Sequence, residues 1–541
     1  MGHETAEAAS WHQDERRTVG AVSAESRPPG RPRSDRHPAA RALFHADGEL
    51  SQAREELRQG LLLLRDGPVA DAYNSLTLAA ATLASTDPAQ ARAACVHATA
   101  AAWSGGDRDG YLAALAALPA VPGPHDGTGA ARDRDSPVDA FWRTYRDGMH
   151  SVMNGDFARA DALLRPVLNV LAARREPLDL LNAGTVALML GDLPTARHLL
   201  GLALAGARSG KAPDLVPRIL EHLAYAELRE GSHHQARVHA EAGLEAAGRL
   251  RQRNVSANLS AVLALAASIT GSPATVAAHA QAALRVAHAH GLRQTATLAE
   301  WAQARADLGH GHAERAAARL APVVHAGPRR GHFGLWVLTV PCYVEAAVLA
   351  GRGADVDADT DTDHVIDAYA VWAGMGADPQ APALLARCRA LVAGDERAEE
   401  LFADALARHD QVNGPFEHAR THLAYGMWLR RRRRPGEARP QLRSAVMGFE
   451  QCGADVWAEH ARAELRAAGE TTGAAGPEPG PLGRLTPQQL RIARHVAQGA
   501  TNREVARQLS ISTRTVEYHL RNVFTQLGVR SRVDLARLLG E

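Results

Sequence analysis

The amino-acid sequence predicts an all-α protein, in which a long α-solenoid of repeated helix pairs precedes a small C-terminal unit of four helices. The composition is rich in alanine and leucine and only 4% aromatic, which favours helices packed on helices. A glycine-led motif returns every 36 to 40 residues through the middle of the chain. The C-terminal stretch carries closely spaced helix start and stop signals.

Two composition breaks divide the 541 residues. Residues 1–42 are polar and rich in Pro, Gly and Arg, and too poor in large apolar groups to build a core, so we expect disorder. The stretch ETTGAAGPEPGPLG, residues 470–483, holds three prolines and four glycines and is typical of a flexible linker. These breaks leave a repeat domain at 43–469 and a terminal domain at 484–541.

The repeat domain is defined by segments that open with glycine and carry a small or apolar residue five places later. The segments are GDFARADALL from Gly155, GDLPTARHLL from Gly191, GSHHQARVHA from Gly231, GSPATVAAHA from Gly271 and GHAERAAARL from Gly311. The small or apolar residues are Ala160, Ala196, Ala236, Val276 and Ala316, and later copies place Ala398 and Ala438 in the same role. Glycine permits the tight turn between two antiparallel helices, and the small residue lets them approach closely. Stacked pairs of this kind build a solenoid, and the pattern resembles tetratricopeptide repeats.

The distribution of charge and of cysteine indicates the kind of partner and the cellular compartment of the protein. The formal net charge is +1, but residues 484–541 hold ten arginines against four acidic residues, which gives this domain +6. Such a basic patch suits a polyanion partner. The four cysteines lie far apart without a CxxC pair, which favours reduced thiols. Without an export signal or a long apolar run, we expect a cytoplasmic protein that makes no membrane contact.

Three stretches that partly match the motifs of nucleotide, calcium or metal sites lack residues that those sites require. GARSGKAPD around Lys211 lacks the glycine spacing and the Ser or Thr of a phosphate loop. The acidic run 355–367 lacks the glycine and glutamate of a calcium loop, so we expect a solvated insertion there. His418 and His422 stand at helical spacing but have no evident third ligand, and the run 430–434 is expected to be a solvated helix end. The sequence therefore predicts no enzyme, no cofactor and no metal site.

The terminal domain carries start and stop signals for four consecutive helices. The signals are Thr486 with Pro487, Gly499, Thr501 with Glu504, Ser512, Gly528, and Ser531 with Asp534. The third helix has one apolar stripe, formed by Val516, Leu520, Val523 and Leu527. Its opposite face presents Arg514, Thr515, Glu517, Tyr518 and Arg521. This is the layout of a helix-turn-helix, in which one helix braces against the backbone and the next enters the major groove.

The stretch LTPQQLRIARHVAQGATNREVARQLSISTRTVEYHLRNVFTQLGVRSRVDLARLL resembles the DNA-binding domain of LuxR-type transcription regulators. It carries their LT, G-x-[ST]-N-[RK]-E-[IV]-A, L-x-[IV]-S-x-x-TV-x-x-H and LGV-x-[SN]-R motifs. Many members have lysine where this chain has Glu517, which cannot attract phosphate but can accept from a cytosine amino group. The resemblance implies DNA contacts by Thr501, Asn502, Ser512, Arg514, Thr515, Glu517, Tyr518, Arg521 and Asn522. It also implies a homodimer paired through Val533, Leu535 and Leu538 of the fourth helix.

The repeat region is similar to that of the large ATP-binding LuxR-type regulators, and we expect a shortened relative without their nucleotide-binding module. The predicted function is sequence-specific, DNA-binding transcription regulation, with double-stranded DNA as partner and the solenoid sensing an effector or a partner protein. RNA polymerase is a further candidate partner. The alternative is a helical-repeat scaffold that is tethered to DNA without an effector switch.

Overall fold

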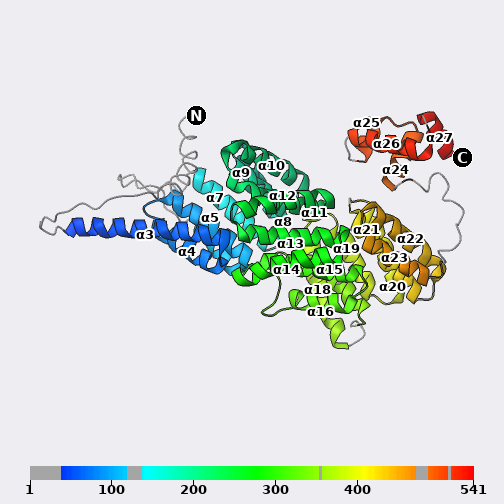
Figure 1. Ribbon diagram of the computed structural model, residues 1–541, viewed down its shortest axis with the longest axis horizontal. Coiled ribbons are helices and arrows are strands. Elements are labelled where there is room, and N and C mark those ends of the chain that lie inside the picture. The colour runs from blue at the N-terminus through cyan, green and yellow to red at the C-terminus, as the bar shows by residue number, and fades with distance from the viewer. Residues whose placement is uncertain are drawn as a thin grey trace.

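A computed structural model describes residues 38–118, 137–351, 356–412, 414–470, 485, 487–509, 513–529 and 531–540. Within these ranges the regular structure is helical and no residue forms a strand, so the predicted all-α class is confirmed. Figure 1 shows the helices stacked side by side as a solenoid, with the four C-terminal helices as a separate unit. Most of the predicted disordered segment and of the predicted linker lies outside the described residues.

Most of the helices follow one another with connections of only a few residues. The first group is α3 (Pro38–Asp66), α4 (Val69–Leu83), α5 (Pro88–Gly105) and α6 (Arg108–Ala117). The second is α7 (Pro137–Met153), α8 (Phe157–Arg174), α9 (Pro177–Met189), α10 (Leu193–Gly206), η2 (Ala207–Lys211), η3 (Pro213–Leu215), α11 (Val216–Glu230) and α12 (His233–Arg249). The third is α13 (Arg253–Thr270), α14 (Pro273–His290), α15 (Arg293–Gly309), α16 (Ala313–Val324), η4 (Trp336–Thr339) and α17 (Val340–Leu349). The fourth is α18 (Val356–Gly374), α19 (Ala381–Val392), α20 (Asp395–His409), α21 (Pro415–Arg431), α22 (Pro435–Gln451) and α23 (Asp455–Ala467). The terminal unit is α24 (Pro487–Ala497), α25 (Asn502–Gln508), α26 (Thr513–Leu527) and α27 (Arg532–Gly540).

The Gly-Asp dipeptides of the repeat motif make the turns. Gly155 has a φ of 80°, and its N–H is bonded to the carbonyl of Val152, which ends α7. The carboxylate of Asp156 then accepts a hydrogen bond of 3.1 Å from the Arg159 N–H and caps α8. The same glycine conformation and aspartate cap recur at Gly191-Asp192. One residue closes a helix and the next opens its partner.

The predicted small positions are buried in the helix pairs. Ala160, Ala196, Ala236, Val276, Ala316, Ala398 and Ala438 are all at most 2% exposed. A second small position, which the sequence reading missed, lies twelve residues before each of them. It is glycine at Gly148, Gly184 and Gly426, where an added Cβ would overlap the leucine sixteen residues later. The helix pairs therefore approach through two small residues per repeat, as close packing requires.

Two details differ from the sequence expectation. From Val356 onward, the acidic run expected as an insertion lies in the N-terminal part of α18, where negative charge suits the end of the helix dipole. Gly271 has a φ of −115° and does not take the left-handed turn. The chain instead stays extended through Ser272, the residue before Pro273, where the helical conformation is disfavoured.

Helices far apart in sequence close the solenoid around α13, whose residues 257–269 are all buried. The Nδ2 of Asn254 donates to the carbonyl of Gly67 at 3.0 Å, which joins α13 to the end of α3. The Nε1 of Trp457 in α23 donates to the carbonyl of Ser268 at 3.0 Å. In Figure 1, α13 and α15 accordingly lie in the middle of the stack. Side chains from both ends of the repeat domain cover this inner region.

Candidate nucleic-acid interface

The C-terminal unit has its own small core. Its buried residues are Leu485, Ile492, Ala493, Val496, Val505, Ala506, Val516, Leu520, Val523 and Leu535. Three of the four residues of the predicted stripe on α26 are in this set, and Leu527 packs partly buried against it. The core fixes α26 by one face and leaves the other face accessible.

The predicted start and stop signals that lie within the described residues appear as local structure, whereas Thr486 and Ser512 lie outside those residues. Thr501 and Glu504 form a reciprocal capping box, in which the Thr501 N–H donates to Glu504 Oε2 at 2.7 Å. The Thr501 hydroxyl accepts from the Glu504 N–H and donates to Oε2 at 2.8 Å. Gly499 and Gly528 have φ values of 93° and 67° and follow the ends of α24 and α26. Ser531 accepts from the Asp534 N–H and opens α27.

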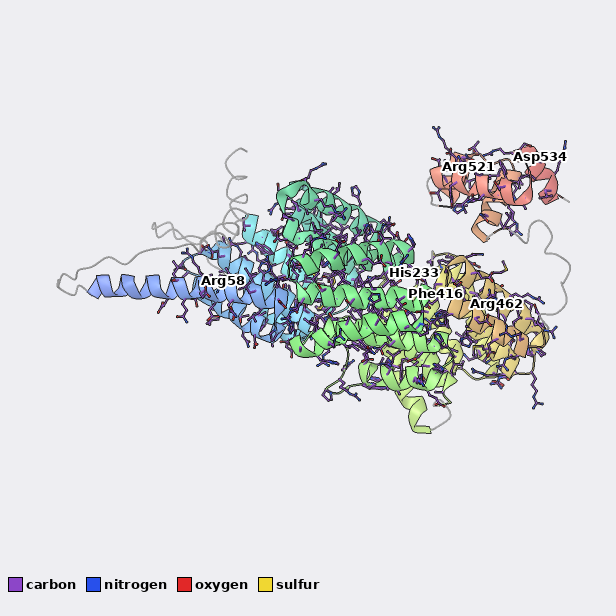
Figure 2. All side chains as sticks on the ribbon, in the orientation of Figure 1. Arg58, His233, Phe416, Arg462, Arg521 and Asp534 are labelled. Carbon is purple, nitrogen blue, oxygen red and sulfur yellow. The ribbon has the colours of Figure 1, made fainter. Side chains whose placement is uncertain are left out.

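The exposed face of α26 carries several predicted contact residues. Glu517 and Arg521 are exposed one turn apart, and Tyr518 beside them is 61% exposed. Figure 2 marks Arg521 on this helix. Thr515 and Asn522 are half-buried at the edge of the face. Ser512 and the Arg514 side chain lie outside the described residues.

Asn502 has a bracing role that was not predicted. Its Oδ1 accepts a hydrogen bond from Arg532 at the start of α27, and a second Arg532 nitrogen donates to the Ala500 carbonyl at 2.9 Å. The asparagine of the G-x-[ST]-N motif and the final arginine of the LGV-x-[SN]-R motif therefore hold α25 and α27 together. The sequence motifs contained both residues but gave no sign that they touch.

The predicted dimer residues on α27 do not share one environment. Leu535 is fully buried in the core of the unit, so its side chain is not available to a partner, and this part of the prediction is wrong. The reason is that α27 packs on α24, and Leu535 belongs to the core to which α24 contributes Ile492, Ala493 and Val496. Leu538 is half-buried, and the Val533 side chain lies outside the described residues.

Two arginines that the sequence reading passed over lie exposed on α25. Arg503 and Arg507 stand one turn apart on the helix that precedes α26. Their i, i+4 spacing is visible in the sequence and could have identified them as candidate phosphate contacts.

A buried charge network in the solenoid also escaped the sequence reading. Arg420 of α21 donates to Glu345 of α17 at 2.6 Å and to Glu417 at 3.0 Å. Arg387 of α19 donates to Glu417 at 2.8 Å. Burial alone would raise the pKa of Glu417, but the Arg420 and Arg387 guanidinium groups hold it well below its ordinary value. The network joins α17, α19 and α21, and its arginines Arg387 and Arg420 are buried.

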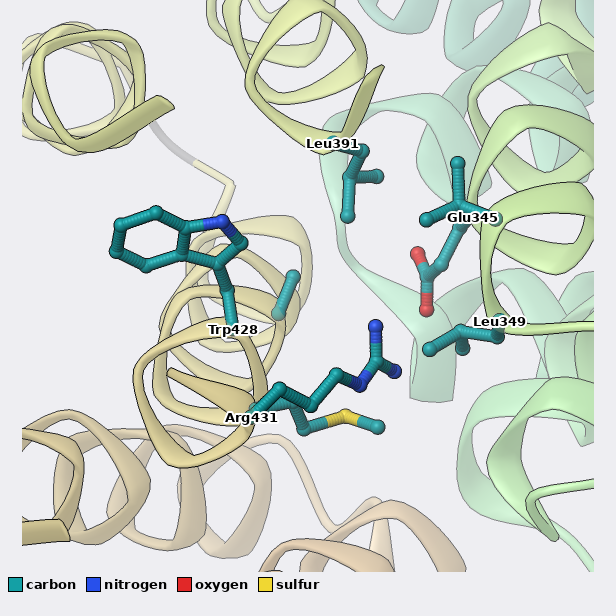
Figure 3. A pocket seen from close by; sticks show the side chains of 8 residues that line it. Glu345, Leu349, Leu391, Trp428 and Arg431 are labelled. Atoms are coloured by element: carbon teal, nitrogen blue, oxygen red, sulfur yellow. The ribbon is translucent and has the colours of Figure 1, made fainter. Parts of the chain in front are cut away.

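Glu345 also borders a pocket between α17, α19 and α21, which Figure 3 shows from close by. Apolar side chains and the Trp428 indole form most of its wall. Its volume is about 20 Å³, which is room for little more than a water molecule. Small-molecule sites usually measure about 300–1,000 Å³, so this pocket does not fit an effector of that size.

The arginine run 430–434 is paired within the solenoid. Arg430 contacts Glu464 at 2.8 Å, and Arg434 contacts Glu399 at 2.7 Å. Part of the run's positive charge is therefore balanced by the chain itself. Among the described residues, no group of three His, Cys, Asp or Glu side chains is arranged to hold a metal ion. The described helices include none long and apolar enough to cross a membrane.

Four short helices, in which α25 is followed within a few residues by α26 and α26 presents a polar face, define a helix-turn-helix domain of the DNA-binding class. Residues 484–539 match the family model for bacterial regulatory proteins of the luxR family. The C-terminal segment is therefore a LuxR-family helix-turn-helix domain, as its motifs predicted.

Similar proteins include a nitrate/nitrite response regulator homolog of Haemophilus influenzae, 43% identical over 64 residues, which are 12% of this chain and 31% of that protein. The nitrate/nitrite response regulator NarP of Escherichia coli is 43% identical over 58 residues, 11% of this chain and 27% of its own length. An HTH-type transcriptional regulator of Mycobacterium bovis is 43% identical over 53 residues, 10% of this chain and 6% of its own length. The chain thus spans less than a third of each of these relatives.

Proposed function

We propose that this protein is a sequence-specific, DNA-binding transcription regulator that reads the major groove with α26. The observation that carries the proposal is the exposed face of this helix, where Tyr518 and Arg521 stand on a scaffold fixed by its own core. The net charge of +6 on residues 484–541 supplies attraction to phosphates. The names of the similar proteins as regulators support the same function.

We further propose that two copies bind DNA together through α27. A single small reader buries too little surface for tight specific binding, and paired half-sites about one helical turn apart overcome this limit. Because Leu535 anchors α27 to its own domain, the contact would rest on the remaining apolar side chains, with Leu538 as the half-exposed member.

For the solenoid, we propose control by a partner protein. The closure around α13 and the small volume of the pocket beside Glu345 argue against a small effector bound in these places. A repeat domain also offers long outer surfaces to another protein. Long outer surfaces would equally suit the alternative, a scaffold that is tethered to DNA without a switch. A partner protein that changes the affinity of the chain for its operator would support control and exclude the scaffold.

The test is DNA binding by the full chain as a function of salt. Specific binding should weaken by several orders of magnitude from low to physiological salt, because phosphate contacts release counterions. Arg521→Ala should weaken specific binding, whereas Arg249→Ala removes the same charge from an exposed site on α12 and should have no effect. Salt-independent binding, or equal behaviour of the two variants, would contradict the proposal.

A further inference from the structure

One acidic side chain stands in the middle of the exposed face of α26. Glu517 lies one helical turn after Thr513 and one turn before Arg521, and all three residues are exposed. Among the residues that the structure describes, no hydrogen bond or ion pair holds the Glu517 carboxylate. In contrast, the carboxylate of Glu504 in the same domain accepts a hydrogen bond in the capping box with Thr501.

The Glu517 carboxylate weakens DNA binding through charge repulsion if this face of α26 contacts DNA. Phosphates repel a carboxylate, and the domain otherwise gathers positive charge. In the major groove, however, cytosine and adenine present amino groups that donate hydrogen bonds. A carboxylate on a groove-facing helix is favourable only where it meets one of these donors.

Arg521 supplies the opposite chemistry one turn later. Its guanidinium has only donors, which match the two acceptors O6 and N7 of guanine. Four residues of α-helix rise about 6 Å, and successive bases of one strand are about 3.4 Å apart. The two side chains therefore reach bases that are about two steps apart.

We propose that Glu517 and Arg521 form a reading pair that sets the specificity of this domain. Glu517 accepts from the N4 amino group of cytosine at one position of the half-site, and Arg521 donates to a guanine about two base steps away. This inference rests on the proposed DNA-binding function and adds to it the bases that are read. The cytosine requirement is a consequence of Glu517, and a neutral or basic side chain at this position would not produce it.

The experiment is a selection from a randomised half-site library with the full chain, followed by dissociation constants on the selected site and its single-base variants. For the wild-type chain, replacing the selected cytosine should weaken binding about tenfold or more. In Glu517→Ala this discrimination should disappear at that position alone. In Glu517→Gln the preference should move to adenine, because a carboxamide both accepts from N6 and donates to N7.

Arg507→Ala provides the control, since it removes one charge from an exposed site on α25 of the same domain. It should weaken binding to all sequences by one common factor without changing any base preference. If Glu517→Ala and Glu517→Gln also change binding to all sequences by one common factor alone, the reading pair is refuted. If the wild-type chain selects no sequence at all, the proposed function itself fails, which is a distinct result.

Discussion

Acidification should destabilise the solenoid, and His332 is the residue through which the effect can be measured most directly. This side chain is fully buried, its Nε2 donates to the Trp103 carbonyl at 2.7 Å, and its Nδ1 accepts from the Gly334 N–H at 3.1 Å. Both nitrogens are thus used by the neutral ring, and a proton on Nδ1 would oppose the Gly334 N–H. Burial lowers the pKa of His332 to about 4, and the nearby Arg293 guanidinium acts in the same direction.

The sign and size of the change in unfolding free energy follow from the difference between the pKa of His332 in the folded and in the unfolded chain. An unfolded histidine titrates near pH 6.5, so the fold favours the neutral form, and this stabilisation is complete above about pH 6.5. It is lost as the pH falls toward about 4, by about 1.4 kcal/mol per pH unit. Between pH 6.5 and 5, His332 should therefore cost about 2 kcal/mol. Burial also lowers the pKa of three other histidines, to about 4 in His233 and His422 and about 3 in His409. These three groups should add to the loss in the same direction.

Urea unfolding followed by far-ultraviolet circular dichroism at pH 7.5, 6.5 and 5.0 measures this loss. His332→Gln keeps an amide donor near the Trp103 carbonyl but cannot titrate. The variant should be less stable at pH 7.5, yet lose about 2 kcal/mol less than the wild type between pH 6.5 and 5. The exposed His234 gives the control, and His234→Gln should leave the pH dependence unchanged. An identical pH dependence in the wild type and His332→Gln would refute the reasoning.

Four substitutions test the remaining structure. Gly191→Ala would overlap the Ala377 carbonyl at a φ of 76°, so it should destabilise the solenoid by at least about 2 kcal/mol in urea titrations; a loss below about 0.5 kcal/mol would contradict the turn packing. Arg532→Ala breaks the brace between α25 and α27 and should cost about 1 kcal/mol in thermal unfolding of the terminal unit, whereas an unchanged midpoint would argue against the brace. Leu538→Asp should keep the helical circular dichroism signal and weaken gel shifts on a full operator far more than on a half-site. Arg521→Ala should cost about 1–3 kcal/mol at the specific site, and equal losses on random DNA would show a phosphate contact.

The repeat architecture was predictable because its determinants are local. The turn at Gly155 and the close approach at Ala160 involve residues within one helix pair, and both recur with the chain's own period. The closure around α13 was not predictable, because it depends on contacts such as that between Trp457 and Ser268, which are 189 residues apart. Single tryptophan and asparagine side chains have no periodic signal in the sequence.

The same distinction applies to the candidate site. The exposed face of α26 follows from one amphipathic stripe, and the structure places Glu517 and Arg521 on it. The role of Leu535 could not be read in this way, because α27 has nine residues and several apolar side chains. Which of them meets α24 is decided by tertiary packing. The motif likewise predicts a DNA contact for Asn502, whereas its hydrogen bond from Arg532 is a tertiary contact 30 residues away in sequence.

A genome-wide occupancy map of the full chain, compared with its Arg521→Ala variant, tests the central claim most directly. The account predicts discrete sites for the wild-type chain that share one paired half-site motif, with a cytosine and a guanine about two steps apart in each half. These sites should be lost in the variant while its cellular level is unchanged. Diffuse occupancy of the wild-type chain, or the same sites in both proteins, would contradict the claim that α26 reads DNA sequence.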